Sequence, residues 1–172
     1  MEINLFLIGQ IFGVIAVILG FITYQIRTQK ALLFVQTLTA LVFVIHYLLI
    51  GAMSGMALNI VAMVRNLVYS RRDLKIFSGK AWPIVFAVIM GIMGLLSWQG
   101  WYSIFVVSGL VINSVCMSFR DAQKIRKSIL ISSPLVLIYD AFALSIGGII
   151  YEAAAIVSAL LGILRFSKEK AK

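Results

Sequence analysis

Long apolar runs are the feature that most limits what this sequence can fold into. Seven of them follow one another with only short connections between. A membrane-spanning helix needs about 20 mostly apolar residues, and lipid admits only helices and closed barrels. We therefore expect an all-α polytopic membrane protein with seven transmembrane helices. They are placed at Leu5–Gln25, Ala31–Ile50, Gly55–Tyr69, Pro83–Trp98, Trp101–Phe119, Ser128–Ile146 and Ile149–Phe166.

The composition supports the membrane class. Of 172 residues, 62% are apolar, whereas 15 are Lys or Arg and 6 are Asp or Glu. That is too few charges to cover the surface of a soluble domain of this length. The net charge of +9 does not indicate nucleic-acid binding, because the basic residues lie in short clusters between apolar runs.

Apart from Arg65 and Arg165, which lie inside predicted spans, the basic residues are confined to alternate connections and the C-terminal tail. The even-numbered connections, Gly51–Ser54, Gln99-Gly100 and Gly147-Gly148, carry no charge. By the positive-inside rule the charged side is cytoplasmic, so we expect the N-terminus outside and the C-terminus in the cytoplasm. The N-terminal residues lack a basic region, which favours a first span over a cleaved signal peptide. The basic residues are Arg27 and Lys30; Arg71, Arg72, Lys75 and Lys80; Arg120, Lys124, Arg126 and Lys127; and Lys168, Lys170 and Lys172 in the tail.

A weak internal repeat relates the two ends of the chain. A shift of 93 residues places Ile45–Asn66 on Ile138–Ala159. It pairs His46 with Tyr139, Tyr47 with Asp140, Gly55 with Gly148 and Asn59 with Glu152. Spans one to three and five to seven would then be parallel triple-helix bundles, an arrangement known in transporters. The predicted units are residues 1–72, a linker with span four at 73–100, and residues 101–172 with a short basic tail.

The stretch "FITYQIRTQKALLFVQTLTALVFVIHYLLIGAMSGMALNIVAMVRNLVYSRRD" and its partner in the second half resemble the bacterial inner-membrane YgjV family. In overall plan the chain is similar to the SWEET, PQ-loop and KDEL-receptor superfamily. The resemblance implies a 3+1+3 arrangement and the handling of a small molecule. It also implies that Asn59, and by the repeat Glu152, contact the solute. The Pro-Gln pair of that superfamily is absent, and Tyr24-Gln25 stands near where it would fall. Pro134 is the one helix-breaking proline in the bundles.

Polar side chains inside the predicted spans are the candidate solute-binding residues. Charges in lipid cost about 2.5–3.5 kcal/mol each, so they usually face the bundle interior and serve a function. At about 1.5 Å of rise per residue, His46, Asn59 and Glu152 lie about 6 Å below the outer ends of their helices. Asp140 lies about 10 Å below. We expect these four to share an outward-facing pocket with Tyr47, Tyr139 and Tyr151; the alternative for each is a purely structural hydrogen bond.

Three further polar residues lie in the cytoplasmic halves of the spans. The Arg65 side chain can snorkel to the cytoplasmic surface as an anchor, or it can be the counter-ion of an anionic group. Asn66 is seven residues from Asn59 and on the same face of the helix. Asn113 in span five can extend this polar line from the second bundle, or it can join helices as a packing contact.

Other chemistry has little support in the sequence. With one His and one Cys, no metal site is predicted, and no phosphate-binding glycine loop is present, so we expect no cofactor and no enzyme activity. The spacings Gly9-x-x-x-Gly13 and Ser158-x-x-x-Gly162 predict close helix packing.

The sequence thus predicts an inner-membrane transporter or facilitator of a small polar or cationic solute. Its partners would be the lipid bilayer and that solute, with a homo-oligomer left open. The alternatives are a binding or receptor-like membrane protein, which the scarcity of prolines favours, and a structural subunit of a larger complex.

Overall fold

The computed structural model describes residues 2–170, with side chains for residues 5–166. Over this range the chain forms seven α-helices, one short 3-10 helix (η1, Lys75–Phe77) and no strand. The all-helical prediction and the number of helices are therefore confirmed. The helices are α1 (Glu2–Gln25), α2 (Gln29–Ile50), α3 (Met53–Ser70), α4 (Trp82–Leu96), α5 (Ser103–Met117), α6 (Ala122–Phe142) and α7 (Ile146–Lys170).

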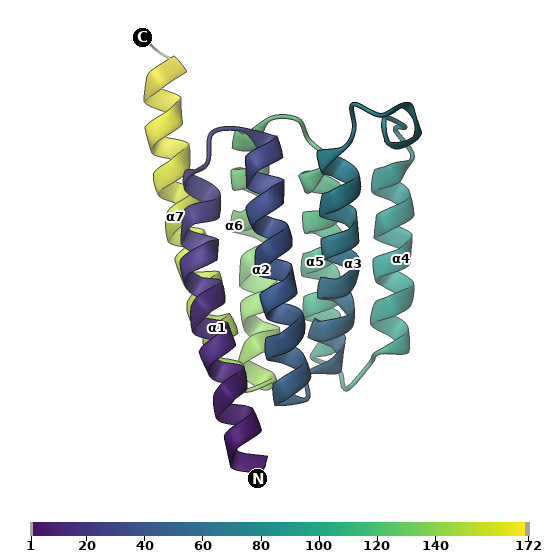
Figure 1. The fold of residues 1–172 in the computed structure, drawn as a ribbon, viewed down its shortest axis with the longest axis vertical. Helices are drawn as coiled ribbons and strands as arrows, with labels where there is room; N and C mark the ends of the chain where they lie inside the picture. Colours follow the sequence, from purple (N-terminus) through teal and green to yellow (C-terminus); the bar gives the residue numbers. More distant parts are fainter. Residues whose placement is uncertain (1, 171–172) are drawn as a thin grey trace.

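The helices run alternately up and down, so the two ends of the chain lie at opposite ends of the molecule (Figure 1). Helix α2 packs between α1 and α3, and α6 packs between α5 and α7. Contacts of α1 with α7 and of α3 with α5 join the two groups into a ring of six helices, while α4 lies outside the ring against α3 and α5. The interior of this ring is where polar side chains can be shielded from lipid.

Three helices contain segments long and apolar enough to cross a membrane, Leu5–Gln25, Gln29–Ile50 and Ile146–Phe166. Helices α4 and α5 are apolar but have 15 residues each, about 22 Å, less than the hydrocarbon thickness of about 30 Å. The short fourth span was predicted. The length of span five, Trp101–Phe119, was wrong, because the Ser103 amide bonds the Gly100 carbonyl at 2.9 Å in a turn and the helix ends at Met117.

The boundaries of span six were also wrong. Helix α6 begins at Ala122, because the Asp121 carboxylate caps it by accepting a 2.8 Å hydrogen bond from the Gln123 amide. It ends at Phe142, two residues before Leu144, whose φ of 53° is left-handed. The connection to α7 is therefore at residues 143–145, and the predicted turn Gly147-Gly148 lies inside α7.

Four of the ten predicted loop cations lie in α-helices. Lys30 is in the first turn of α2, and Lys124, Arg126 and Lys127 are in the first turns of α6. All remain at the end of the molecule that carries Arg27, Arg71 and Arg120, so the one-sided charge pattern persists (Figure 1). The side chains of Lys168 and Lys170, and all of Lys172, lie outside the described residues.

The surface of the ring is apolar, and its interior contains many polar side chains among the apolar ones. Ile11, Val88 and Leu164 are 60%, 54% and 61% exposed, as expected where lipid replaces water. The buried polar side chains are Thr23, Gln36, Thr39, His46, Ser54, Arg65, Asn66, Ser103, Asn113, Ser114, Arg126, Ser128, Ser132, Ser133, Asp140, Ser145, Glu152 and Ser158.

Small residues bring α1 close to its neighbours. A Cβ on Gly13 would lie 2.6 Å from the Gly147 Cα, and one on Gly9 would lie 2.8 Å from the Ile50 side chain. On α7, the Ser158 hydroxyl donates to the Phe21 carbonyl at 2.8 Å, and a Cβ on Gly162 would lie 2.6 Å from the Tyr24 carbonyl oxygen. The predicted packing role of both small-residue spacings is confirmed.

Two glutamines clamp the uncharged hairpins in the same way. Gln99 donates to the Gly51 carbonyl at 3.0 Å and accepts from the Ser54 amide at 3.3 Å. Gln10 donates to the Leu144 carbonyl at 3.1 Å and accepts from the Gly147 amide at 3.1 Å. Gly51 and Leu144 differ by the predicted shift of 93, and so do Ser54 and Gly147. Gly51 and Leu144 both have positive φ.

The charged end shows the same recurrence. Gln29 donates to the carbonyls of Met117 and Phe119 at 3.2 and 2.6 Å. The Arg126 guanidinium donates to the carbonyls of Tyr24 and Ile26 at 2.9 and 2.5 Å. The accepting carbonyls are again related by a shift of 93.

Candidate functional site

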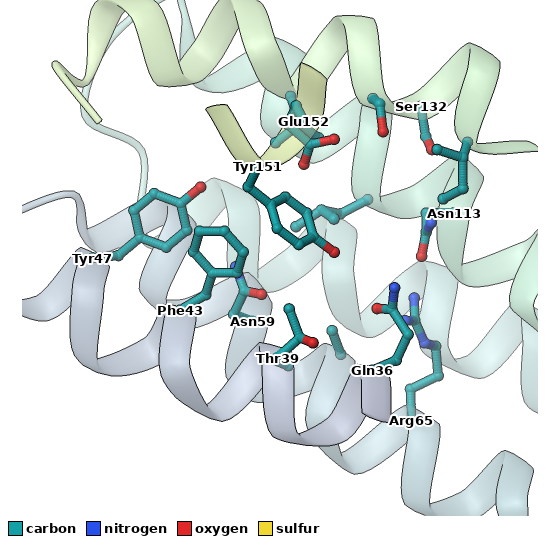
Figure 2. Close-up of a pocket in the computed structure, with 16 residues that line it drawn as sticks. Gln36, Thr39, Phe43, Tyr47, Asn59, Arg65, Asn113, Ser132, Tyr151 and Glu152 are labelled. Carbon is teal, nitrogen blue, oxygen red and sulfur yellow. The ribbon is translucent and has the colours of Figure 1, made fainter. Parts of the chain in front are cut away.

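A cavity of about 50 Å³ lies inside the ring and is lined by residues of α2, α3, α5, α6 and α7 (Figure 2). Since one water molecule needs about 10–15 Å³ by this measure, it has room for about three to five waters or a solute of similar size. Its lining residues are Gln36, Thr39, Ala40, Phe43, Tyr47, Asn59, Ala62, Arg65, Leu110, Asn113, Ile129, Ser132, Ser133, Val136, Tyr151 and Glu152.

The two ends of the cavity differ in charge. Figure 2 shows Arg65, Gln36 and Asn113 together toward one end and Tyr47 toward the other, with Glu152 between them. Arg65 is five residues from the end of α3 that faces the charged end of the molecule, whereas Tyr47 is three residues from the end of α2 that faces the uncharged end. The cavity therefore has a basic end, and its one carboxylate, Glu152, lies farther along the helix axes toward the uncharged end of the molecule.

Asn59 and Glu152, the pair matched by the repeat, both line the cavity. Each follows the first residue of its helix by six positions, about 9 Å of rise, which is deeper than expected. The Asn59 Nδ2 donates to the Gly55 carbonyl at 2.8 Å. Glu152 is 8% exposed, and Ser133 lies beside its carboxyl group.

Arg65 does not snorkel to the surface, and that expectation was wrong. The side chain is 1% exposed and lines the cavity. Its Nε and Nη2 donate to the Asn66 Oδ1 at 3.1 and 2.8 Å, and its Nη1 has no partner. The nearby Asn66 Nδ2 and Ser114 Oγ are also buried without hydrogen bonds. Asn113 lines the cavity, whereas Asn66 does not.

Three predicted site residues, His46, Tyr139 and Asp140, do not line this cavity; each is 0% exposed. They lie in a hydrogen-bonded cluster near the uncharged end. Because α6 ends at Phe142, Asp140 is two residues from the end of its helix, about 3 Å of rise and not the expected 10 Å. Asp140 reaches the cavity only through Tyr47, whose hydroxyl donates to Asp140 Oδ1 at 2.7 Å.

His46 connects this cluster to α1. Its Nδ1 lies 2.7 Å from the Gly9 carbonyl oxygen, and its Nε2 lies 2.7 Å from the Ser145 hydroxyl. A carbonyl can only accept, so we assign the proton to Nδ1. In the neutral ring, Nε2 then accepts from Ser145, whose single hydrogen is thereby used.

This assignment leaves Asp140 with one unsatisfied oxygen. Asp140 Oδ2 is buried without a hydrogen-bond partner. The Ser145 hydroxyl oxygen lies on the same side of Gly148, since a Cβ on that glycine would contact both oxygens. A protonated Asp140 could donate from Oδ2 to that oxygen, which also accepts from the Gly148 amide at 3.1 Å. A proton on the carboxyl would therefore allow the hydrogen bonds of His46, Ser145 and Asp140 to be completed.

Tyr139 repeats the position of His46 in the second half of the ring. Its hydroxyl oxygen accepts from the Gly55 amide at 3.0 Å, at the start of α3. His46 reaches the equivalent Gly148 amide through Ser145. Each side chain thus fixes the first turn of a helix in the opposite half of the chain, Tyr139 directly and His46 through Ser145. This is the structural hydrogen bond given above as the alternative role of His46.

Sequence reasoning missed five polar residues at or beside the site. Gln36, Thr39, Ser132 and Ser133 line the cavity, and Ser145 links His46 to the start of α7. The one available signal was the spacing of Gln36, Thr39, Phe43 and Tyr47, which puts polar groups on the helix face that holds Tyr47. Among the described residues, no three His, Cys, Asp or Glu side chains gather as metal ligands would.

A family model described as "Bacterial inner membrane protein" matches residues 7–170 of the chain. Searches of the curated proteins and of the solved structures found no match.

Proposed function

The chain belongs to this family, Imp-YgjV, whose members are bacterial inner membrane proteins, and we propose that it is a small-solute transporter or facilitator. The observation that carries the proposal is the polar cavity inside a ring with an apolar surface. Charged and amide side chains within the membrane usually mark a solute or ion path. Here Arg65, Asn113 and Glu152 come from three different helices and line the same small cavity.

We further propose that the ring consists of two parallel triple-helix bundles, α1–α3 and α5–α7, joined by α4 as a linker. The recurrence of the hairpin clamps and of the carbonyl contacts at a shift of 93 supports this division. So does the cavity, whose lining comes from both groups of helices. Binding between two repeats is the usual arrangement in transporters built this way. The charge pattern supports an outer N-terminus and a cytoplasmic C-terminus.

The solute we propose is small and polar or cationic. A cavity for about three to five waters is too small for a sugar ring in the conformation described. Glu152 supplies a carboxylate to its wall, and Asp140 lies behind Tyr47. Aromatic rings of Phe43 and Tyr151, with centroids 4.7 Å apart, form part of the wall at this end, and such rings favour cations.

Flux into proteoliposomes tests the proposal. The purified chain is reconstituted, and uptake of labelled amines, amino acids and small polyols is compared with that of empty liposomes. Glu152→Gln should lower the flux of the accepted solute at least tenfold, since it removes a charge at the cavity wall. Arg72→Gln is the matched control, because Arg72 does not line the cavity. No flux across the panel, or flux unchanged in Glu152→Gln, would reject transport through this cavity.

One observation favours a second candidate, a binding or receptor-like membrane protein. Pro134 is the one proline inside a helix of the described chain, apart from Pro83 in the first turn of α4. Prolines that break helices allow parts of a bundle to move, and their scarcity suits a protein that binds without transporting. Saturable binding without flux would favour this candidate, and co-purification of a stable companion would favour a structural subunit.

A further inference from the structure

Arg65 is a buried cation without an acidic hydrogen-bond partner. Its side chain is 1% exposed, and within the described part of the chain its hydrogen bonds go to the Oδ1 of the neutral Asn66 amide. An uncompensated charge in a medium of low polarity is strongly unfavourable. The unpartnered Nη1 and the cavity beside it leave a position at which an anionic group could compensate the charge.

The surroundings of Arg65 are rich in donors. Asn66 Nδ2 and Ser114 Oγ are buried with no hydrogen-bond partner, and both can donate. The Asn113 amide lines the cavity, and Figure 2 shows it facing the Arg65 guanidinium. A planar guanidinium with amide donors beside it is the arrangement that binds carboxylates.

The other side of the same cavity has the opposite character. Glu152 supplies a carboxylate to the wall, and the rings of Tyr47 and Phe43, stacked at 5.3 Å between centroids, line the same cavity. A carboxylate near aromatic faces suits an ammonium group. Figure 2 shows Glu152 and Arg65 on opposite sides of the cavity.

We propose that the cavity binds a short zwitterion, with its carboxylate at Arg65 and Asn113 and its ammonium at Glu152. This inference rests on the proposed solute site and specifies the class of solute. The cavity, with room for about three to five waters, fits a molecule the size of a small amino acid. The competing occupant is a chain of waters that bridges Arg65 and Glu152, which would make the pair structural.

Half-molecules, which carry only the ammonium or only the carboxylate of a zwitterion, distinguish a bound zwitterion from a chain of waters in the wild-type protein. Binding of glycine, β-alanine, 4-aminobutyrate and glycine betaine to the purified chain in lipid nanodiscs is measured by calorimetry. Acetate, propionate, methylamine and ethylamine each carry only one of the two charged groups. We expect at least one zwitterion to bind at least tenfold more tightly than every half-molecule. Equal binding of an amine and the matching zwitterion would overturn the proposal.

Two variants test which charged group of the solute Arg65 and Glu152 each bind. Arg65→Met should abolish the preference for the zwitterion over its amine, and Glu152→Gln should abolish the preference over its carboxylate. Arg72→Met is the control for loss of an arginine, because Arg72 lies outside the cavity and bonds the Ser118 carbonyl. Unchanged preferences in both cavity variants would contradict the assignment. The comparison of half-molecules in the wild type holds even if a variant fails to fold.

Failure of this inference differs from failure of the transport proposal. Selective zwitterion binding without flux into proteoliposomes would sustain the inference and reject transport. Flux of amines that ignores the carboxylate would sustain transport and reject the inference. Neither binding nor flux with any probe would reject both.

Discussion

The Tyr47 hydroxyl donates a 2.7 Å hydrogen bond to Asp140 Oδ1, and the two residues are separated by 93 positions, the shift of the internal repeat. Each is therefore the repeat equivalent of the other. Equivalent residues meet only close to the axis that relates two halves, so this contact locates where α2 and α6 approach each other. The tyrosine lines the cavity while the carboxyl lies behind it.

Asp140→Asn should leave stability nearly unchanged, because an amide reproduces the protonated carboxyl. Its oxygen can accept from Tyr47, and its NH2 group can donate to the Ser145 hydroxyl oxygen. Asp140→Ala removes both and leaves the Tyr47 hydroxyl unpaired, at a cost of about 1–3 kcal/mol. Thermal unfolding in detergent, followed by circular dichroism, compares the two variants.

The sign of the Asp140→Asn effect is the informative result. If the native carboxyl is ionised and held by a bound cation, the amide would lose that interaction and destabilise the fold as much as alanine does. Equal midpoints for Asn and Ala would therefore contradict the proton assignment.

Gly13→Val should disrupt the contact between α1 and α7. A Cβ at Gly13 would lie 2.6 Å from the Gly147 Cα, where only backbone could yield. Overpacking of this kind typically costs about 1–3 kcal/mol. Gly91→Ala is the matched control, since a Cβ on Gly91 meets nothing within 4 Å. Equal unfolding midpoints for both variants would contradict the close helix approach.

Gln10→Ala and Gln99→Ala should destabilise the chain to a similar extent. Each removes one donor and one acceptor from an equivalent uncharged hairpin. Both clamps are partly exposed, so we expect about 0.5–1.5 kcal/mol for each. Chemical unfolding measures both. A large loss for one and none for the other would mean that the two clamps are not equivalent.

The topology prediction needs only fusions. Green fluorescent protein after residue 172 should fluoresce, and alkaline phosphatase at the same position should be inactive, if the basic end is cytoplasmic. Phosphatase inserted at Gly51 or Gly100 should be active, because those positions lie at the uncharged end. Active phosphatase at the C-terminus would reverse the orientation proposed for the cavity.

Much of the fold could be predicted from the sequence because the apolar runs set the number of helices independently of their packing. The repeat anticipated that Asn59 and Glu152 would occupy matching positions, and both line the cavity. The end of α6 was missed because Gly147-Gly148 is the usual signal for a turn, whereas the chain turns at Leu144. A leucine in the left-handed backbone conformation cannot be recognised from the sequence, because leucine rarely adopts it.

The grouping of side chains was harder to predict than the helices. Whether Arg65 reaches the surface depends on which helices surround it, and α5 places Asn113 and Ser114 on that side. His46 and Asp140 were expected in the pocket, but Ser145 and Gly9 hold His46 outside it. Serines are common in such spans, so Ser145 could not be singled out without the fold.

The most direct test of the polar cavity as a solute site is an experimental structure of the chain purified in native lipid, at a resolution that separates waters from solutes. We predict continuous density, larger than water, that contacts the Arg65 guanidinium and the Asn113 amide at one end and the Glu152 carboxylate at the other. Separate water peaks between Arg65 and Glu152, or direct pairing of the two side chains, would contradict the account.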